Sequence, residues 1–315
     1  MVIFLTIISV LTIILLAAIV ISYICYRMAF YVRDCDKKSS EEFPIPEGEI
    51  YEPFREKMVG WIKETRQLPH QTFEVKSFDG LTLRAKYYEQ IPGAPIELMF
   101  HGYRGYAERD LCGGVQRCFA LGHNAFIVDQ RASGDSDGNV ISFGINESKD
   151  CHTWLSLMCN HFGPDVQILL TGISMGASTV LNAAAAPLPG NVIGILADCG
   201  FSSPKAIIQK VILDMKLPVR LAYPFVWLGG KLFGHFDLNE ITSENAVKKC
   251  TIPVLFFHGD NDAYVPWQMS RINYDACTCR KKLVLIPGAG HGLSYPVAPA
   301  LYIEEMHDFF HGNNR

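Results

Sequence analysis

The residues 169–178, LLTGISMGAS, place one hydroxyl group, that of Ser174, between two glycines and directly after an apolar run. A serine attacks a carbonyl only when a base takes its proton and an acid orients that base. The spacing Gly-x-Ser-x-Gly also occurs by chance, so it indicates a nucleophile only where a strand precedes the serine and a helix follows it.

Both flanks of Ser174 fit that requirement. The run VQILLT (166–171) predicts a strand, and ASTVLNAAAA (177–186) predicts an alanine-rich helix. In a nucleophile elbow the turn between strand and helix is so sharp that the serine backbone is strained and its neighbours must be small. Gly172 and Gly176 are the small neighbours. The helix N-terminus also favours developing negative charge, so Ser174 is the predicted nucleophile.

The predicted base and acid follow the last two apolar runs. His291 lies between two glycines in PGAGHGLSYP (287–296), and Asp262 lies in FFHGDNDAYVP (256–266). The chain order serine, aspartate, histidine is the order that goes with this elbow. Asp262 is preferred to Asp260 because it sits further into the loop, and Asp260 is read as a turn residue. Asp198, after an earlier strand, remains an alternative acid.

Two backbone amides are the predicted donors to a tetrahedral oxyanion. One belongs to Met175, the residue after the nucleophile, and the other to Tyr103 in MFHGYRG (99–105). His101 is expected to shape that loop. No phosphate-binding glycine loop or cluster of metal ligands is apparent, so no cofactor is expected. His307 and His311 are read as a surface pair.

Apolar runs alternate with predicted helices along most of the chain. The runs are residues 96–100, 125–129, 166–171, 192–198, 253–259 and 282–288, and a hairpin turning at Asp79-Gly80 precedes them. This alternation predicts an α/β fold, a mostly parallel sheet flanked by helices, over residues 72–315. Residues 201–247 interrupt the rhythm and predict a small helical cap, which either packs on the domain or lines a substrate groove.

The chain begins with an uncharged apolar segment over residues 2–26, longer than the about 20 residues that cross a bilayer. Residues 1–26 are therefore predicted to be a transmembrane helix anchored in the lipid bilayer, with a cleaved signal peptide as the alternative. Arg27, Arg33, Lys37 and Lys38 follow the segment and predict a cytoplasmic domain. Residues 27–47 are read as a tether and 48–71 as a docking helix.

Composition excludes other classes of function. The 315 residues carry a net charge of −4 with mixed signs and no basic block, which argues against a nucleic-acid partner. The ten cysteines are scattered, and their spacing matches neither a disulfide framework nor a paired-cysteine zinc site.

Five motifs together resemble membrane-anchored bacterial α/β-hydrolases of the serine type. They are HGYRG, DQRASGDSDG, GISMGAS, HGDNDAYVP and GAGHG, and the resemblance runs from about Thr72 to the C-terminus. Ala132-Ser133 depart from many relatives, in a loop where Asp129 and Arg131 are expected to be structural. The serine at the elbow separates this chain from relatives that carry aspartate or cysteine there.

The resemblance implies an enzyme that cleaves a small carboxylic ester or thioester through a covalent acyl-enzyme. Peptidase-like members of the family leave an amidase or aminopeptidase acting on small peptides as an alternative. A catalytically idle scaffold tethered to the membrane is the alternative from a different class of function.

Overall fold

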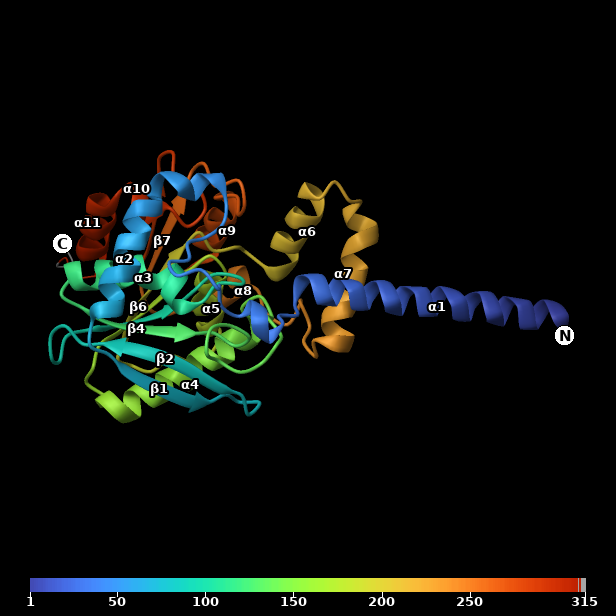
Figure 1. Ribbon diagram of the computed structural model, residues 1–315, viewed down its shortest axis with the longest axis horizontal. Coiled ribbons are helices and arrows are strands. Elements are labelled where there is room, and N and C mark those ends of the chain that lie inside the picture. The colour runs from blue at the N-terminus through green and yellow to red at the C-terminus, as the bar shows by residue number, and fades with distance from the viewer. Residues whose placement is uncertain (311, 313–315) are drawn as a thin grey trace.

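The apolar runs form the strands of one sheet in the computed structural model, which describes residues 1–310 and 312 (Figure 1). The strands are β1 (Gln71–Lys76), β2 (Thr82–Tyr88), β3 (Ile96–Phe100), β4 (Asn124–Asp129), β5 (Ile168–Ile173), β6 (Val192–Asp198), β7 (Val254–Gly259) and β8 (Lys281–Ile286). Their order across the described eight-stranded sheet is β1-β2-β4-β3-β5-β6-β7-β8. Strand β2 runs antiparallel to both of its neighbours, and the strands from β4 to β8 are parallel. The predicted mostly parallel α/β sheet is confirmed.

Helices cover both faces of this sheet. The described helices are α1 (Val2–Ala29), α2 (Arg55–Gln67), α3 (Ala107–Ala120), α4 (Ile145–Phe162), α5 (Met175–Ala183), α6 (Pro204–Asp214), α7 (Val219–Phe233), α8 (Ser243–Val247), α9 (Gln268–Ala276), α10 (Ser294–Val297) and α11 (Pro299–Phe310). Two short 3₁₀ turns span Asp34–Asp36 and Glu49–Phe54. Helices α4, α5, α8 and α9 share one apolar cluster with the sheet, and α2 and α11 pack on the other face with α3 beside them.

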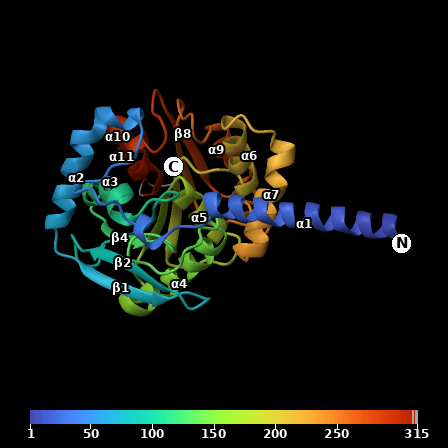
Figure 2. The same cartoon turned by 45° about the vertical axis from the view of Figure 1, so that its right-hand side comes forward.

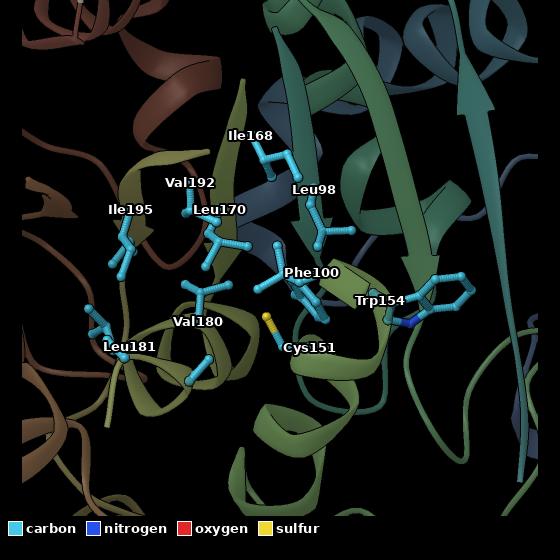
Figure 3. Packing of buried hydrophobic residues seen from close by; sticks show 14 of the residues in the cluster. Leu98, Phe100, Cys151, Trp154, Ile168, Leu170, Val180, Leu181, Val192 and Ile195 are labelled. Carbon is cyan, nitrogen blue, oxygen red and sulfur yellow. The ribbon is translucent and has the colours of Figure 1, made fainter. Parts of the chain in front are cut away.

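The core beneath α4 and α5 holds the strand that leads to Ser174. Leu170 on β5 packs there with Phe100 on β3, while Trp154 and Val180 point in from α4 and α5 (Figure 3). All five residues of β3 are buried, as expected for a strand covered by helices on both faces. This packing fixes the position, relative to the sheet, of the turn at which β5 ends and α5 begins.

The predicted docking segment, residues 48–71, begins with a 3₁₀ turn and continues as α2. Met58 and Ile62 on α2 are buried, whereas Ile50 on the preceding turn is 49% exposed. Trp61 packs against Gly113 of α3, where a β-carbon would come within 2.8 Å of the indole ring. The segment therefore contacts the domain mainly through α2.

The predicted tether, residues 27–47, is bound to the domain in the structure. The backbone of Val32 donates to Asn139 and that of Ile141 donates to Phe30, each at 2.8 Å. Phe30, Val32 and Ile45 are buried. Residues 27–47 pack against the domain because this largely charged stretch also contains apolar side chains that become buried.

Helix α1 projects away from the sheet and crosses α7, as both views of the chain show (Figures 1 and 2). It is the one helix among the described residues long and apolar enough to span a membrane, with a mean hydropathy of 3.0 over 18 residues, none of them buried. The crossing is close, because a β-carbon on Gly229 of α7 would lie 2.4 Å from the carbonyl oxygen of Ser22. Helix α1 is thus both a candidate anchor and a packing partner of α7.

We predict that Gly229→Ala lowers the melting temperature of the full chain in detergent. The added methyl group overlaps Ser22 and Tyr26, and overpacking of this kind costs about 1–3 kcal/mol. The matched control is Gly60→Ala in α2, where a β-carbon meets no atom within 4 Å. The control should leave the melting temperature unchanged or raised, since alanine favours a helix by roughly 0.5–1 kcal/mol over glycine. Equal melting temperatures for the two variants would contradict the close crossing.

Candidate active site

Ser174 lies at a sharp turn between β5 and α5, and its backbone has φ 57° and ψ −120°. Two glycines make this turn possible. A β-carbon on Gly176 would lie 2.0 Å from the carbonyl oxygen of Phe100, and one on Gly172 would lie 2.2 Å from the carbonyl carbon of Gly176. Any larger residue at either position would push α5 away from β3 and β5. The turn thus has the geometry that the sequence predicts for an elbow.

His291 lies between Ser174 and Asp262, in the loop between β8 and α10. Its Nε2 is 2.9 Å from the Ser174 Oγ, and its Nδ1 is 2.7 Å from Asp262 Oδ2. Both distances are within hydrogen-bond range, so the structure brings the three predicted residues into one chain of hydrogen bonds. The ring can accept from the serine at Nε2 while it donates to the carboxylate at Nδ1.

Asp262 receives hydrogen bonds on both carboxylate oxygens. The amides of Tyr264 and Val265 donate to Oδ1 at 2.8 Å each, and the two histidines His291 and His258 face Oδ2. Burial acts to raise the pKa of Asp262, but the hydrogen bonds from His258 and His291 outweigh it and hold the pKa below its usual range. The carboxylate is therefore ionised at neutral pH.

His258 is a participant that the sequence reasoning missed. It is fully buried at the end of β7, and its Nε2 lies 2.8 Å from the Val265 carbonyl oxygen and 3.2 Å from Asp262 Oδ2. Its Nδ1 lies 2.7 Å from the Ser270 hydroxyl. The sequence held a signal for this residue: His258 stands in FFHGD at the end of the strand that leads to Asp262, four residues before that acid.

The two alternative acids bind other groups. Asp260 accepts a hydrogen bond from the Gly288 amide at 2.7 Å, as a turn residue does. Asp198 at the end of β6 is buried and accepts from the hydroxyl groups of Ser294 at 2.8 Å and Tyr302 at 3.1 Å. Neither is the carboxylate that contacts His291.

The loop after β3 runs beside Ser174. A β-carbon on Gly102 would lie 3.5 Å from Ser174 Cβ, so this backbone passes the serine within van der Waals distance. Asp110 accepts from the Gly102 amide at 3.1 Å. His101 is fully buried, accepts from the Gln130 amide at Nε2 and faces the Gly102 carbonyl through Nδ1, which makes it a loop-shaping residue. Tyr103 follows Gly102, and Met175 is the first residue of α5.

The Tyr103 and Arg104 side chains bind the end of α1. The Tyr103 hydroxyl donates to the Ala29 carbonyl at 2.8 Å, and Arg104 Nη2 donates to the carbonyls of Met28 and Tyr31 at 3.0 Å each. The last carbonyls of a helix have no partner within it, so these side chains supply the missing donors. The loop beside Ser174 is thereby attached to the apolar N-terminal helix.

Ser174 and His291 open into a cavity of about 770 Å³. The cavity extends over the sheet face that α2, α3 and α11 cover, where Met58, Trp61 and Met99 are among the lining residues. None of its lining residues comes from 201–247. The alternative in which that segment lines a substrate groove is therefore wrong for this cavity. Helix α7 instead packs its glycine side, at Gly229, against α1.

A metal site at the same place is a poor fit. Ligand atoms of Cys199, Asp262 and His291 lie within 4.8 Å of one another. However, Asp262 already accepts from His291, and the other ring nitrogen of His291 faces the Ser174 Oγ at 2.9 Å. A hydrogen-bonded acid and base account for the arrangement better than a metal does.

The remaining predicted residues lie outside the cavity. Arg131 pairs with Asp150 and Asp79, and Asp129 accepts from the Ala107 amide, so both act in the structure of their loop. His307 is exposed on α11, and His311 lies outside the described residues. The cysteines are all thiols, and Cys277 Sγ is 3.2 Å from Cys279 Sγ.

We predict that Asp262→Asn makes the free energy of unfolding less dependent on pH in the acid range. A carboxyl group whose pKa is lowered by folding stabilises the protein above its unfolded pKa of about 4, and that stabilisation is lost as pH falls further. The free energy of unfolding should therefore fall less for Asp262→Asn than for the unchanged chain when the pH is lowered from about 6 to about 3, a range that spans the unfolded pKa. Parallel losses in the two proteins would contradict a lowered pKa.

Comparison with known proteins supports the fold. No protein-family model matches the chain. YqkD of Bacillus subtilis, an uncharacterised protein, is 28% identical over 195 residues, which cover 62% of this chain and 64% of YqkD, less than two thirds of its length. Protein bem46 of Schizosaccharomyces pombe is 25% identical over 232 residues, 71% of each chain. The esterase Pf2001 of Pyrococcus furiosus superposes with a TM-score of 0.65 at 19% identity, covering 84% of this chain and 95% of that one. With its sheet order and its elbow, the chain has the α/β-hydrolase fold.

Proposed function

We propose that this protein is a serine hydrolase that cleaves neutral carboxylic esters through a covalent acyl-enzyme. The observation that carries the proposal is the hydrogen-bond chain from the Ser174 Oγ through His291 to Asp262, at 2.9 and 2.7 Å, at the wall of a cavity. The structural relative from Pyrococcus furiosus is named an esterase, which agrees with this reaction class. Because the identity is low, the substrate is argued from this chain alone.

The proposed reaction has two halves. Ser174 attacks the ester carbonyl while His291 Nε2 takes the serine proton, and His291 then gives that proton to the leaving alcohol. The acyl group stays on Ser174 until a water, activated by the same nitrogen, releases it as an acid. Asp262 keeps the Nδ1 proton of His291 in place and stabilises the ring when it is charged.

Two amides are proposed to bind the oxyanion of each tetrahedral intermediate. The Met175 amide stands at the start of α5, where helix N–H groups have no partner within the helix. The Tyr103 amide follows Gly102, whose backbone passes alongside Ser174. Donors held in place before the reaction stabilise charge without any cost of reorganisation.

The charges around the cavity favour a neutral substrate. Arg109 pairs with Asp110, and the buried Arg117 pairs with Glu97. Arg104 donates its hydrogen bonds to two backbone carbonyls and to the Tyr103 hydroxyl. The lining also includes the carboxylates of Glu47 and Glu49. These groups would repel the phosphates of an acyl carrier such as a coenzyme thioester, so we favour a simple ester over that thioester.

Attachment to a membrane is part of the proposal. Helix α1 packs on the domain through Ser22 and Tyr26, which a cleaved signal peptide would not do in the mature protein. The basic residues Arg27, Arg33 and Lys37 after the helix favour a cytoplasmic site for the domain.

We predict that Ser174→Ala and His291→Ala each lower kcat for p-nitrophenyl esters by on the order of 10⁴-fold or more, and that the double variant is little worse. The members of one catalytic unit act together, so their losses do not add. Ser174→Ala should also abolish labelling by a fluorophosphonate, which needs an activated serine. An unlabelled but folded parent protein would instead favour the idle scaffold.

A matched pair of variants tests the acid. Asp262→Asn should cost a large factor in kcat because it leaves His291 without the partner that fixes its tautomer. Asp260→Asn should leave kcat nearly unchanged, since its carboxylate serves a turn. The reverse result would move the acid to Asp260.

We predict that kcat/KM rises from acetate to medium-chain esters, by up to about fourfold per methylene, since a buried methylene contributes about 0.8 kcal/mol. Trp61→Ala should flatten the rise because Trp61 lines the cavity. Trp227→Ala should not, because Trp227 lies on α7 away from the cavity. Melting temperatures of both variants control for stability. A flat series in the parent, with activity on aminoacyl amides, would favour the peptidase alternative.

A further inference from the structure

The α6–α7 hairpin carries an apolar surface that the proposed reaction does not use. The hairpin stands away from the sheet and runs across α1 in both views (Figures 1 and 2). Its exposed apolar side chains are Leu213 (65%), Met215 (49%), Leu217 (45%), Leu221 (68%) and Leu232 (45%). Single exposed apolar residues are ordinary, but several of them on one hairpin mark a contact surface.

On α7 the exposed Leu221 and Leu232 form one stripe with the half-buried Phe225 and Leu228. Leu221, Phe225, Leu228 and Leu232 follow each other at spacings of four, three and four residues, which places them on one side of a helix. Val226, Gly229 and Gly230, the buried positions, face α1 and the domain. A third side is polar, where Trp227 donates to Asp237 at 3.0 Å and Lys231 pairs with the same carboxylate.

The position of the stripe along α1 identifies its neighbour. At 1.5 Å per residue, residues 2–21 of α1 form about 30 Å of helix, the thickness of the hydrocarbon layer. Helix α7 crosses α1 at Ser22, directly after that length. Tyr23, Tyr26 and Arg27 follow, and such aromatic and basic residues are typical of the membrane–water interface. The Tyr23 ring packs against Phe233 of α7 with centroids 5.2 Å apart.

We propose that the α6–α7 hairpin is a second membrane contact, in which α7 lies in the interface and its leucine stripe is in contact with lipid. The occupant is the phospholipid bilayer, because α7 crosses α1 at the end of the length that a bilayer would cover. Two exposed basic residues on α7, Arg220 and Lys231, suit a helix at a membrane surface, although Lys231 also pairs with Asp237. This proposal rests on the proposed attachment of α1 to a membrane and is independent of the proposed catalysis.

The test is photo-crosslinking of the full chain in vesicles of phosphatidylcholine and phosphatidylglycerol. Leu221 is replaced by p-benzoylphenylalanine, a photoreactive residue tolerated at an exposed position. Leu301 on α11, an exposed leucine (38%) at the end of the molecule far from α1, is the matched control, and Ile8 within α1 is the positive control (Figure 1). We expect a phospholipid adduct at positions 8 and 221 and none at 301.

Two results would overturn the proposal. A covalent dimer at position 221 without a lipid adduct would make the stripe an interface between copies of this chain. Lipid adducts at 221 no more frequent than at 301, with position 8 reacting normally, would leave the hairpin outside the bilayer. Hydrolysis of a soluble ester by the 221 variant, at the rate of the parent, checks that its fold is intact.

Discussion

The left-handed backbone of Ser174 is the constraint on which the rest of the site depends. It exists because β5 must end and α5 must begin within one residue, while the Gly176 backbone is pressed against the Phe100 carbonyl at the end of β3. A non-glycine residue with positive φ is costly, and it persists only where the surrounding packing leaves no alternative. The core under α4 and α5 supplies that packing (Figure 3). The position of the hydroxyl group is therefore a property of the whole sheet.

The other groups reach the serine because parallel strands end at the same edge of the sheet. The loop of Gly102 and Tyr103 follows β3, Asp262 follows β7 and His291 follows β8. For Asp262 to orient His291, its carboxylate must stay charged although it is buried. Four donors around its oxygens make that possible, namely two backbone amides and two histidines. His258 is the least obvious of these donors. Its burial under Ser270 and Val265 ties the acid to the strand rather than to the loop alone.

The sequence predicted the parts that depend on local pattern. Strand spacing gave the sheet, and the Gly-x-Ser-x-Gly turn with its flanking strand and helix indicated the elbow; Ser174, Asp262 and His291 then come together in the structure. The sequence left open which apolar surfaces pack together. Residues 201–247 could either pack on the domain or line a substrate groove; in the structure α7 packs on α1, and the cavity is lined by Trp61 and Met58. Spacing along the chain cannot tell these two uses of an apolar helix apart.

The loop of Tyr103 and Arg104 lines the cavity and is bonded to the end of α1, so a bilayer around α1 would stand at a fixed distance from the site. Seven residues separate Ser22, where α7 crosses, from Ala29, whose carbonyl accepts from Tyr103. At 1.5 Å per residue that is about 10 Å along the helix. If α7 lies in the interface as proposed, the loop that carries the Tyr103 amide stands within the depth of the headgroup layer. Arg104 and Tyr103 bind carbonyls at the end of α1 and just after it, so the helix and that loop are held together. If α1 is the anchor, the same helix that holds the domain at the membrane also helps to fix the geometry beside Ser174.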